Sequence, residues 1–191
     1  MAIKNGFNIQ LVAGIPSEYY GLEKSGKIEP AMEFRALYGL RMGYRWYIFP
    51  QDKWGMGITS NWFDLSLSYK KGTYDEGSFI RTISDISILQ FGPIVTVRLS
   101  SDMAIDGYFT VRPTLMDSYR KIEYPDDSNY DSDFKALGIN DAFGIAYRWK
   151  VLCIGIDYVF GSIKITGQRL AERTETKIVT NNIQFVLGVK F

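Results

Sequence analysis

Apolar and polar residues alternate along the stretch EFRALYGLRMGYRWYIF, residues 33–49. At 100° per residue, Arg35, Arg41 and Arg45 fall within about 120° of one another while the aromatic residues scatter around the helix, so no helical face results. At a period of two, the apolar residues share one side, and Glu33, the arginines and the glycines share the other. The stretch is therefore predicted to be a β-strand. Because strands of globular proteins average about 5 or 6 residues, its length indicates a layer thicker than a globular core.

The same alternation recurs throughout the chain and predicts eight strands. They cover residues 6–15, 33–49, 54–70, 87–99, 104–116, 137–149, 151–161 and 177–191. In the third strand the phase changes near Asn61 and Trp62, which predicts a β-bulge. GSIKIT, residues 161–166, could extend the seventh strand, so the pattern leaves a ten-stranded barrel open as an alternative.

The connections between these strands alternate in length. The short ones are residues 49–53, 100–103 and the turn at Lys150, and the long polar ones are residues 16–30, 70–84, 117–136 and 162–176. Short turns at one end and long loops at the other are typical of an antiparallel up-and-down β-barrel. The chain is predicted to form one such barrel over residues 1–191.

The next question is which side of the strands faces inward. An eight-stranded barrel has room for side chains or one small ligand, and rows of Trp, Tyr, Phe and Leu would crowd it. Glycines and charged residues fit a narrow lumen better, where arginine and aspartate can form ion pairs. The predicted lumen charge network consists of Glu33, Arg35, Arg41, Arg45, Asp64, Arg98, Asp106, Arg112, Arg148, Asp157 and Lys190.

The apolar side then faces lipid, and the fold class is an all-β transmembrane barrel. Aromatic residues gather near both ends of the strands, as expected for girdles at two membrane–water interfaces. The predicted girdle residues are Tyr44, Trp46, Trp54, Tyr69, Tyr147, Trp149, Tyr158 and Phe160.

Composition removes several classes of function. The formal net charge is +1 and the sequence pI about 7.7, so no overall field attracts nucleic acid, and no nucleic-acid partner is expected. The sequence has no histidine, which removes imidazole bases, common zinc ligands and Ser/His/Asp triads. With Cys153 as the one cysteine, an intrachain disulfide is excluded. A nonenzymatic protein without cofactor or metal is therefore expected.

The N-terminus does not indicate a cellular compartment. It lacks the apolar region of a signal peptide, and no run is long enough for a transmembrane helix. A mature form that starts after cleavage and a cytoplasmic protein both fit this observation.

The last strand ends on alternating apolar residues followed by a terminal phenylalanine. This assembly signal consists of Ile183, Phe185, Leu187, Val189 and Phe191. It is similar to the C-terminal signature that the bacterial outer-membrane assembly machinery recognises. With eight strands and four long loops, the chain resembles the small OmpA-like, OmpX-like and opacity-type barrels. The resemblance implies the bacterial outer membrane, periplasmic termini, extracellular long loops, and contact with the assembly machinery, outer-membrane lipid and lipopolysaccharide.

The most distinctive long connection is EYPDDSNYDSDF. Its candidate binding-loop residues are Tyr124, Asp126, Asp127, Tyr130, Asp131 and Asp133, which could contact a divalent ion, lipopolysaccharide or another extracellular ligand. The spacing from Asp127 to Asp131 is similar to an EF-hand start, but Ser132 stands where the loop needs glycine, so no calcium site is predicted.

The function expected from the sequence is that of a nonenzymatic outer-membrane barrel with an occluded polar lumen. It would act through its extracellular loops, in surface binding, adhesion or envelope integrity. The alternatives are a soluble lipocalin-like barrel for a small ligand and a narrow outer-membrane pore.

Overall fold

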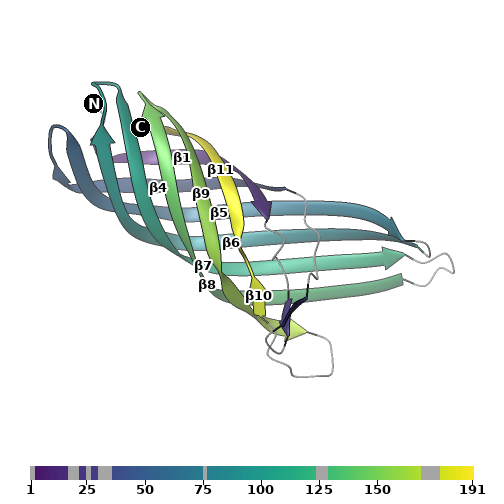
Figure 1. Cartoon of the computed structure of the whole chain (residues 1–191). Coiled ribbons are helices and arrows are strands. Elements are labelled where there is room, and N and C mark those ends of the chain that lie inside the picture. The colour runs from purple at the N-terminus through teal and green to yellow at the C-terminus, as the bar shows by residue number, and fades with distance from the viewer. Residues whose placement is uncertain are drawn as a thin grey trace.

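The computed structural model describes residues 3–16, 22–24, 27–29, 36–74, 77–123, 129–168 and 177–191. Eight antiparallel strands form a closed ring (Figure 1). They are β1 (Gly6–Pro16), β4 (Leu37–Pro50), β5 (Trp54–Tyr74), β6 (Gly77–Arg98), β7 (Met103–Glu123), β8 (Asn129–Trp149), β9 (Leu152–Gln168) and β11 (Asn182–Lys190). The predicted up-and-down barrel is confirmed.

Strand β11 closes the ring because it pairs with both β1 and β9. Leu187 lies opposite Leu11 on one side and opposite Ile154 on the other. The predicted eighth strand is divided near Thr180, and its first part is the separate strand β10 (Lys177–Val179). That strand pairs with β9 and with β2 (Leu22–Lys24), which in turn pairs with β3 (Lys27–Glu29).

Strands β5 to β9 are longer than the sequence pattern predicts. Strand β6 has 22 residues and β5, β7 and β8 have 21 each, whereas a tilted strand needs about 9–11 residues to cross a bilayer. Much of the predicted loops 70–84, 117–136 and 162–176 is therefore strand, and those loop boundaries are wrong. The long strands run past the rest of the ring at one end (Figure 1).

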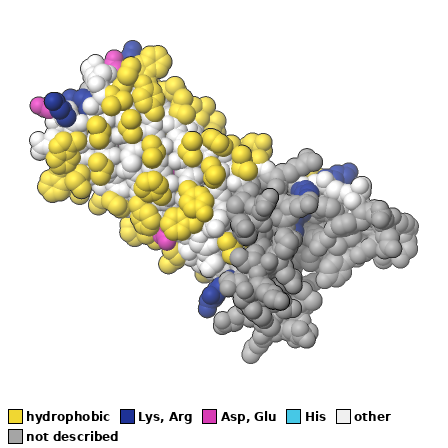
Figure 2. All heavy atoms as spheres, viewed as in Figure 1, with side chains coloured by type: hydrophobic (Ala, Val, Ile, Leu, Met, Phe, Trp, Pro, Cys, Tyr) yellow, Lys and Arg dark blue, Asp and Glu magenta, His cyan; other side chains and the backbone are white. Residues whose placement is uncertain are grey.

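The outer surface of the ring is apolar. Leu11, Phe143, Ile145, Ile154 and Phe185 are each about half exposed, and hydrophobic side chains cover much of the described barrel surface (Figure 2). Polar residues alternate with them and point inward. This arrangement contradicts the soluble lipocalin-like alternative, which needs its apolar side chains inside.

No helix among the described residues is long and apolar enough to cross a membrane.

Two neighbouring bulges adjust the phase of the alternation. The register of β4 and β5 shifts so that Trp62 is the extra residue, as predicted, and both Trp62 and Phe63 lie on the outer side. In β6 a second shift occurs around Leu89, whose φ is 55°. Across from the first bulge, a Cβ at Gly43 would lie 2.2 Å from the carbonyl oxygen of Ser60, so the close approach of β4 to β5 requires glycine there.

Backbone hydrogen bonds join neighbouring turns at the short-turn end. The Arg98 amide donates to the Lys53 carbonyl over 2.8 Å, and the Lys150 amide donates to the Asp102 carbonyl over 2.7 Å. The Phe191 amide donates to Phe7 over 2.9 Å. Both chain ends lie at this end of the barrel (Figure 1). The rim that carries the termini is thus a hydrogen-bonded ring of turns.

At the opposite end the polarity of the strands reverses. Ile83, Met116, Ala136, Ile163 and Ile178 form a buried cluster with at most 1% exposure. On the outer side at neighbouring register positions stand mostly polar residues: Ser84, Asp117, Lys135, Ser162 and Lys164. Apolar inside and polar outside is the pattern of a protein surrounded by water. We call the part of β5 to β9 from the level of this cluster to the strand ends at residues 74, 77, 123, 129 and 168 the extension.

Replacing Leu40 with arginine tests the lipid-facing side. Leu40 pairs in register with Leu11, the central residue of β1, and its side chain points outward. We expect Leu40→Arg to lower the free energy of unfolding by about 2–4 kcal/mol, because arginine is costly near the bilayer midplane. Tryptophan fluorescence during urea unfolding in lipid vesicles measures this cost.

The matched control is Leu99→Arg. Leu99 is 55% exposed beside a short turn, where arginine reaches water and should cost about 0–1 kcal/mol. Equal losses of stability in the two variants would contradict the assigned membrane position.

Candidate functional site

The interior of the barrel holds a charge network centred on Arg41. Its guanidinium donates to Asp64 over 2.7 Å, to Asp157 over 2.6 Å and to Gln184 over 2.8 Å. These residues come from β4, β5, β9 and β11, so the arginine links both halves of the ring. Arg41 is 2% exposed. Each partner is an ionised or polar acceptor, which is what a buried guanidinium requires.

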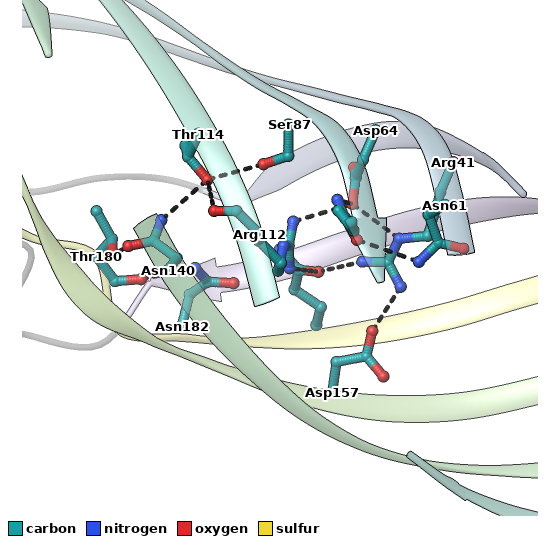
Figure 3. Close-up of polar contacts among 12 residues, drawn as sticks. Arg41, Asn61, Asp64, Ser87, Arg112, Thr114, Asn140, Asp157, Thr180 and Asn182 are labelled. Atoms are coloured by element: carbon teal, nitrogen blue, oxygen red, sulfur yellow. Dashed lines mark hydrogen bonds and ion pairs between the residues drawn. The ribbon is translucent and has the colours of Figure 1, made fainter. Parts of the chain in front are cut away.

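We call the contacts around Arg41 the upper network. Arg112 extends this network along the barrel axis (Figure 3). It donates to Asp64 over 2.9 Å. Beyond it, Thr114 shares a hydrogen bond of 2.9 Å with Ser87 and accepts one of 3.3 Å from Asn140. The polar contacts thus continue toward the extension.

The two bulges place the side chains that complete the upper network. Because Trp62 and Leu89 are extra residues, Asn61, Asp64 and Gln90 all face inward. The Gln90 amide donates to Asp64 over 2.9 Å and its oxygen accepts from Asn61 over 3.1 Å. A regular alternation would turn one of Asn61 and Asp64 toward lipid.

A lower network lies closer to the short-turn end and is centred on Asp106. This carboxylate has no solvent exposure and accepts hydrogen bonds from Arg45, Arg148 and Thr96. The contacts from Arg148 measure 2.6 and 2.9 Å, and that from Thr96 measures 2.6 Å. Two arginines therefore share a single carboxylate.

Sequence analysis did not identify two interior tyrosines. The Tyr108 hydroxyl donates to Asp157 over 2.5 Å, and the Tyr47 hydroxyl contacts Thr96 over 2.7 Å. The period-two pattern could have identified Tyr108, because it lies two residues after Asp106 in the strand and so faces the same side. A Cβ at Gly144 would lie 2.4 Å from the Tyr108 ring, so this glycine makes room for it.

The interior is not polar throughout. Below the upper network, Ile3, Tyr47, Ile94, Tyr108, Ala146 and Cys153 form a buried cluster, and the apolar cluster of the extension lies above it. Ile3 belongs to the N-terminal segment, and the Tyr47 amide donates to Asn5 of the same segment over 2.7 Å. The N-terminal segment thus reaches into the barrel mouth.

The other predicted network residues are placed as follows. Arg98 is half-buried at the short-turn end, and Lys190 is 8% exposed and donates to the Lys4 carbonyl over 2.5 Å. Glu33 and Arg35 lie outside the described residues. Asp85, which the prediction omitted, is 8% exposed and faces the interior near Arg112.

The predicted girdle residues lie on the outer surface. Trp46, Trp54, Tyr69, Tyr147, Trp149 and Tyr158 are between 39% and 57% exposed, whereas Tyr44 and Phe160 are partly buried. Tyr158 and Phe160 stack, with ring centroids 5.8 Å apart. That these rings form membrane girdles stays a prediction.

The predicted assembly signal lies on the outward side of β11 and at the residue after it. Ile183, Phe185, Leu187 and Phe191 are 46–70% exposed, and Val189 is partly buried. Of the candidate binding loop, Tyr130, Asp131 and Asp133 belong to β8. Tyr124, Asp126 and Asp127 lie outside the described residues.

Electrostatic contacts continue on the surface of the extension. Lys121 donates to Glu123 over 2.6 Å, and this hydrogen bond lowers the pKa of the Glu123 carboxyl. Within the described ranges, no three His, Cys, Asp or Glu side chains are grouped as metal ligands would be.

Replacing Asp106 with asparagine tests the lower network. The change leaves two buried guanidinium groups without their shared anion, and we expect it to lower the free energy of unfolding by about 3–5 kcal/mol. The control Asp52→Asn removes an exposed carboxylate from a short turn and should change stability by less than about 0.5 kcal/mol. Urea unfolding in vesicles compares the two, and equal stabilities would refute the structural role of Asp106.

Comparison with known proteins identifies the fold. No protein-family model and no curated protein sequence matches the chain. Among solved structures, the outer membrane protease OmpT from Escherichia coli is similar with a TM-score of 0.54 and 6% identity, over 98% of this chain and 95% of that one.

Two further structures of outer-membrane proteins are similar at lower TM-scores. The attachment invasion locus protein Ail of Yersinia pestis has a TM-score of 0.45 and 10% identity, over 98% of this chain and 97% of that one. Neisserial surface protein A has a TM-score of 0.45 and 13% identity, over 96% and 95%. The closed ring, the apolar outer surface and the OmpT likeness together show that the chain has the fold of the small bacterial outer-membrane β-barrel proteins.

Proposed function

We propose that the protein is a nonenzymatic outer-membrane barrel that holds the extension outside the cell as a rigid binding surface. The observation that carries this proposal is the reversal of polarity along β5 to β9. Because the extension has its own buried apolar cluster, its strands are held by packing as well as by hydrogen bonds. A surface ordered in advance loses less conformational entropy when it binds a partner.

The orientation of the barrel supports this proposal. In outer-membrane barrels short turns face the periplasm and longer connections face the outside. The short-turn end carries both chain ends, and the extension lies opposite (Figure 1). The extension then projects into the extracellular medium.

The outer surface of the extension offers side chains suited to binding. Tyr69 is 57% and Tyr119 44% exposed, and both align in register with Thr82 on the strand between them. Adjacent strands are about 4.8 Å apart, so the two tyrosines stand on one face with Thr82 between them. Tyrosine is enriched at protein interfaces. The candidate residues Tyr130, Asp131 and Asp133 belong to β8 in the same sheet.

The proposal also assigns roles to the residues that meet the membrane. Lys135 and Lys164 are exposed beside outward Leu137, at the level where the apolar surface gives way to polar residues. Their ammonium groups are suited to the phosphates of lipopolysaccharide. The predicted girdle residues other than Tyr69, which stands on the extension, would anchor the barrel at both interfaces, and the assembly machinery would recognise the C-terminal strand.

A narrow pore agrees less well with the interior. Charged side chains bridge opposite strands at Arg41, and apolar clusters lie on both sides of the upper network. We expect the protein to show no stable conductance steps in planar bilayers, because eight strands leave a lumen that side chains fill. Regular single-channel steps that depend on the protein would favour the pore instead.

Truncation of the hairpins tests the proposed binding surface. One variant removes residues 69–82 and joins Ser68 to Ile83, and the other removes residues 119–133 and joins Ser118 to Phe134. Both pairs are register partners, so an Asn-Gly turn can close each hairpin. The measurement is the adhesion of bacteria displaying each variant to immobilised extracellular-matrix proteins and sulfated polysaccharides.

We expect the full-length protein to raise adhesion above the empty-vector level on at least one coating, and at least one truncation to abolish the gain. Heat-dependent gel migration of each variant checks that its barrel has assembled. Full adhesion by both assembled truncations, or no gain from the full-length protein on any coating, would contradict the proposal.

A further inference from the structure

A pocket of about 410 Å³ lies at the short-turn end of the barrel. Four cationic residues line it: Lys4, Arg148, Lys150 and Lys190. Among the described residues that line it, Asp102 is the acidic one. Because Lys4 comes from the N-terminal segment, Lys150 from the turn between β8 and β9, and Lys190 from β11, separate parts of the chain bring these cations together.

The buried charges next to the pocket do not balance. Three buried cations, Arg45, Arg148 and Lys190, stand against the single buried carboxylate of Asp106 among the described residues at this end. The Lys190 ammonium donates to a neutral group, the Lys4 carbonyl, over 2.5 Å, and lies 5.0 Å from the centre of the Tyr47 ring. Arg45 and Arg148 alone outnumber the Asp106 carboxylate by one charge, and Lys190 adds to this positive excess in a region of low dielectric.

The upper network provides an internal comparison. There, the two buried arginines Arg41 and Arg112 stand against three buried carboxylates, those of Asp64, Asp85 and Asp157. The same barrel therefore neutralises its arginines in one half and leaves a positive excess in the other. Arg98, half-buried at the same end, adds to that excess.

The residues around the mouth of the pocket indicate the kind of anion that it can bind. Lys4 and Lys150 are exposed, and their ammonium groups can each donate several hydrogen bonds to an oxyanion. Lys150 has φ 54° and its ammonium lies 5.9 Å from the centre of the Trp149 ring. Val151 and Phe191 on the wall are 53% and 70% exposed. The pocket thus combines cations with hydrocarbon, at the edge of the apolar surface.

We propose that this pocket binds the phosphate group of a phosphate ester. Phosphate offers several charged oxygens to the lysines, and the positive excess from Arg45, Arg148 and Lys190 attracts it. The ester can be a phospholipid headgroup of the adjacent membrane leaflet or a soluble phosphorylated compound. In either case the bound anion offsets the buried positive charge.

The test uses the full-length protein refolded in dodecylmaltoside micelles, which contain no phosphate. Three probes are titrated separately: dihexanoyl-phosphatidylglycerol, glycerol 3-phosphate and inorganic phosphate. The readout is the NMR shift of backbone amides from Trp149 to Leu152 and at Lys190. We expect saturable shifts with at least one phosphate ester, larger than any produced by the same concentration of sodium chloride.

The variant Lys4→Gln/Lys150→Gln removes the two exposed donors without touching the buried networks. It should weaken binding at least tenfold, whereas Lys53→Gln, an exposed lysine on another short turn outside the pocket, should leave binding unchanged. Heat-dependent gel migration checks that each variant is folded.

The probes also separate the two sources of the phosphate ester. Saturation by dihexanoyl-phosphatidylglycerol alone assigns the pocket to a lipid headgroup, and equal affinity for glycerol 3-phosphate assigns it to a soluble ester. Absence of saturable shifts with both esters would overturn the proposal. Equal weakening by Lys53→Gln would also overturn it, because general attraction to positive charge would then explain the binding.

Discussion

Closure of the sheet is the constraint on which the rest of the structure depends. In lipid an unpaired backbone N–H or C=O group has no water to bond with, so a sheet that crosses a membrane cannot keep an open edge. Strand β11 removes both edges because it pairs with β1 and β9. Once eight strands close, alternate side chains must face either lipid or a narrow interior. That division accounts for the apolar outer surface and for the polar residues placed inside.

The narrow interior in turn shapes the charge networks. A buried ion pair gains little net stability because both ions lose their hydration, but each charge left without a partner would be much more costly. Arg41 satisfies this requirement through acceptors on three other strands, and in doing so it fixes the positions of those strands across the ring. With the interior occupied by such contacts, the two ends of the barrel are the parts that can meet other molecules. The proposed roles of the extension and of the phosphate pocket both follow from this view.

Much of the fold could be predicted from the period-two pattern, including the phase change at Trp62. The extension could not, because its polarity is reversed. Ile83 faces inward whereas Ile86 faces outward, so apolar residues no longer mark one side and the stretch resembles a loop. The partners inside the barrel were also beyond the sequence. Arg41 and Asp157 are separated by 116 residues, and their contact depends on the shear and closure of the whole ring. Tyr108 was missed because an aromatic ring suggests the lipid side, although its phase with Asp106 places it inside.

The most direct test of closure is to measure backbone contacts between β1 and β11 by NMR, with the protein in lipid nanodiscs. If the ring is closed, nuclear Overhauser effects will connect the two strands in the register Ile9 with Val189, Leu11 with Leu187 and Ala13 with Phe185. The amides of both strands will also exchange slowly with water. Absence of these contacts together with rapid exchange along β1 would show an open edge and would contradict the closed barrel.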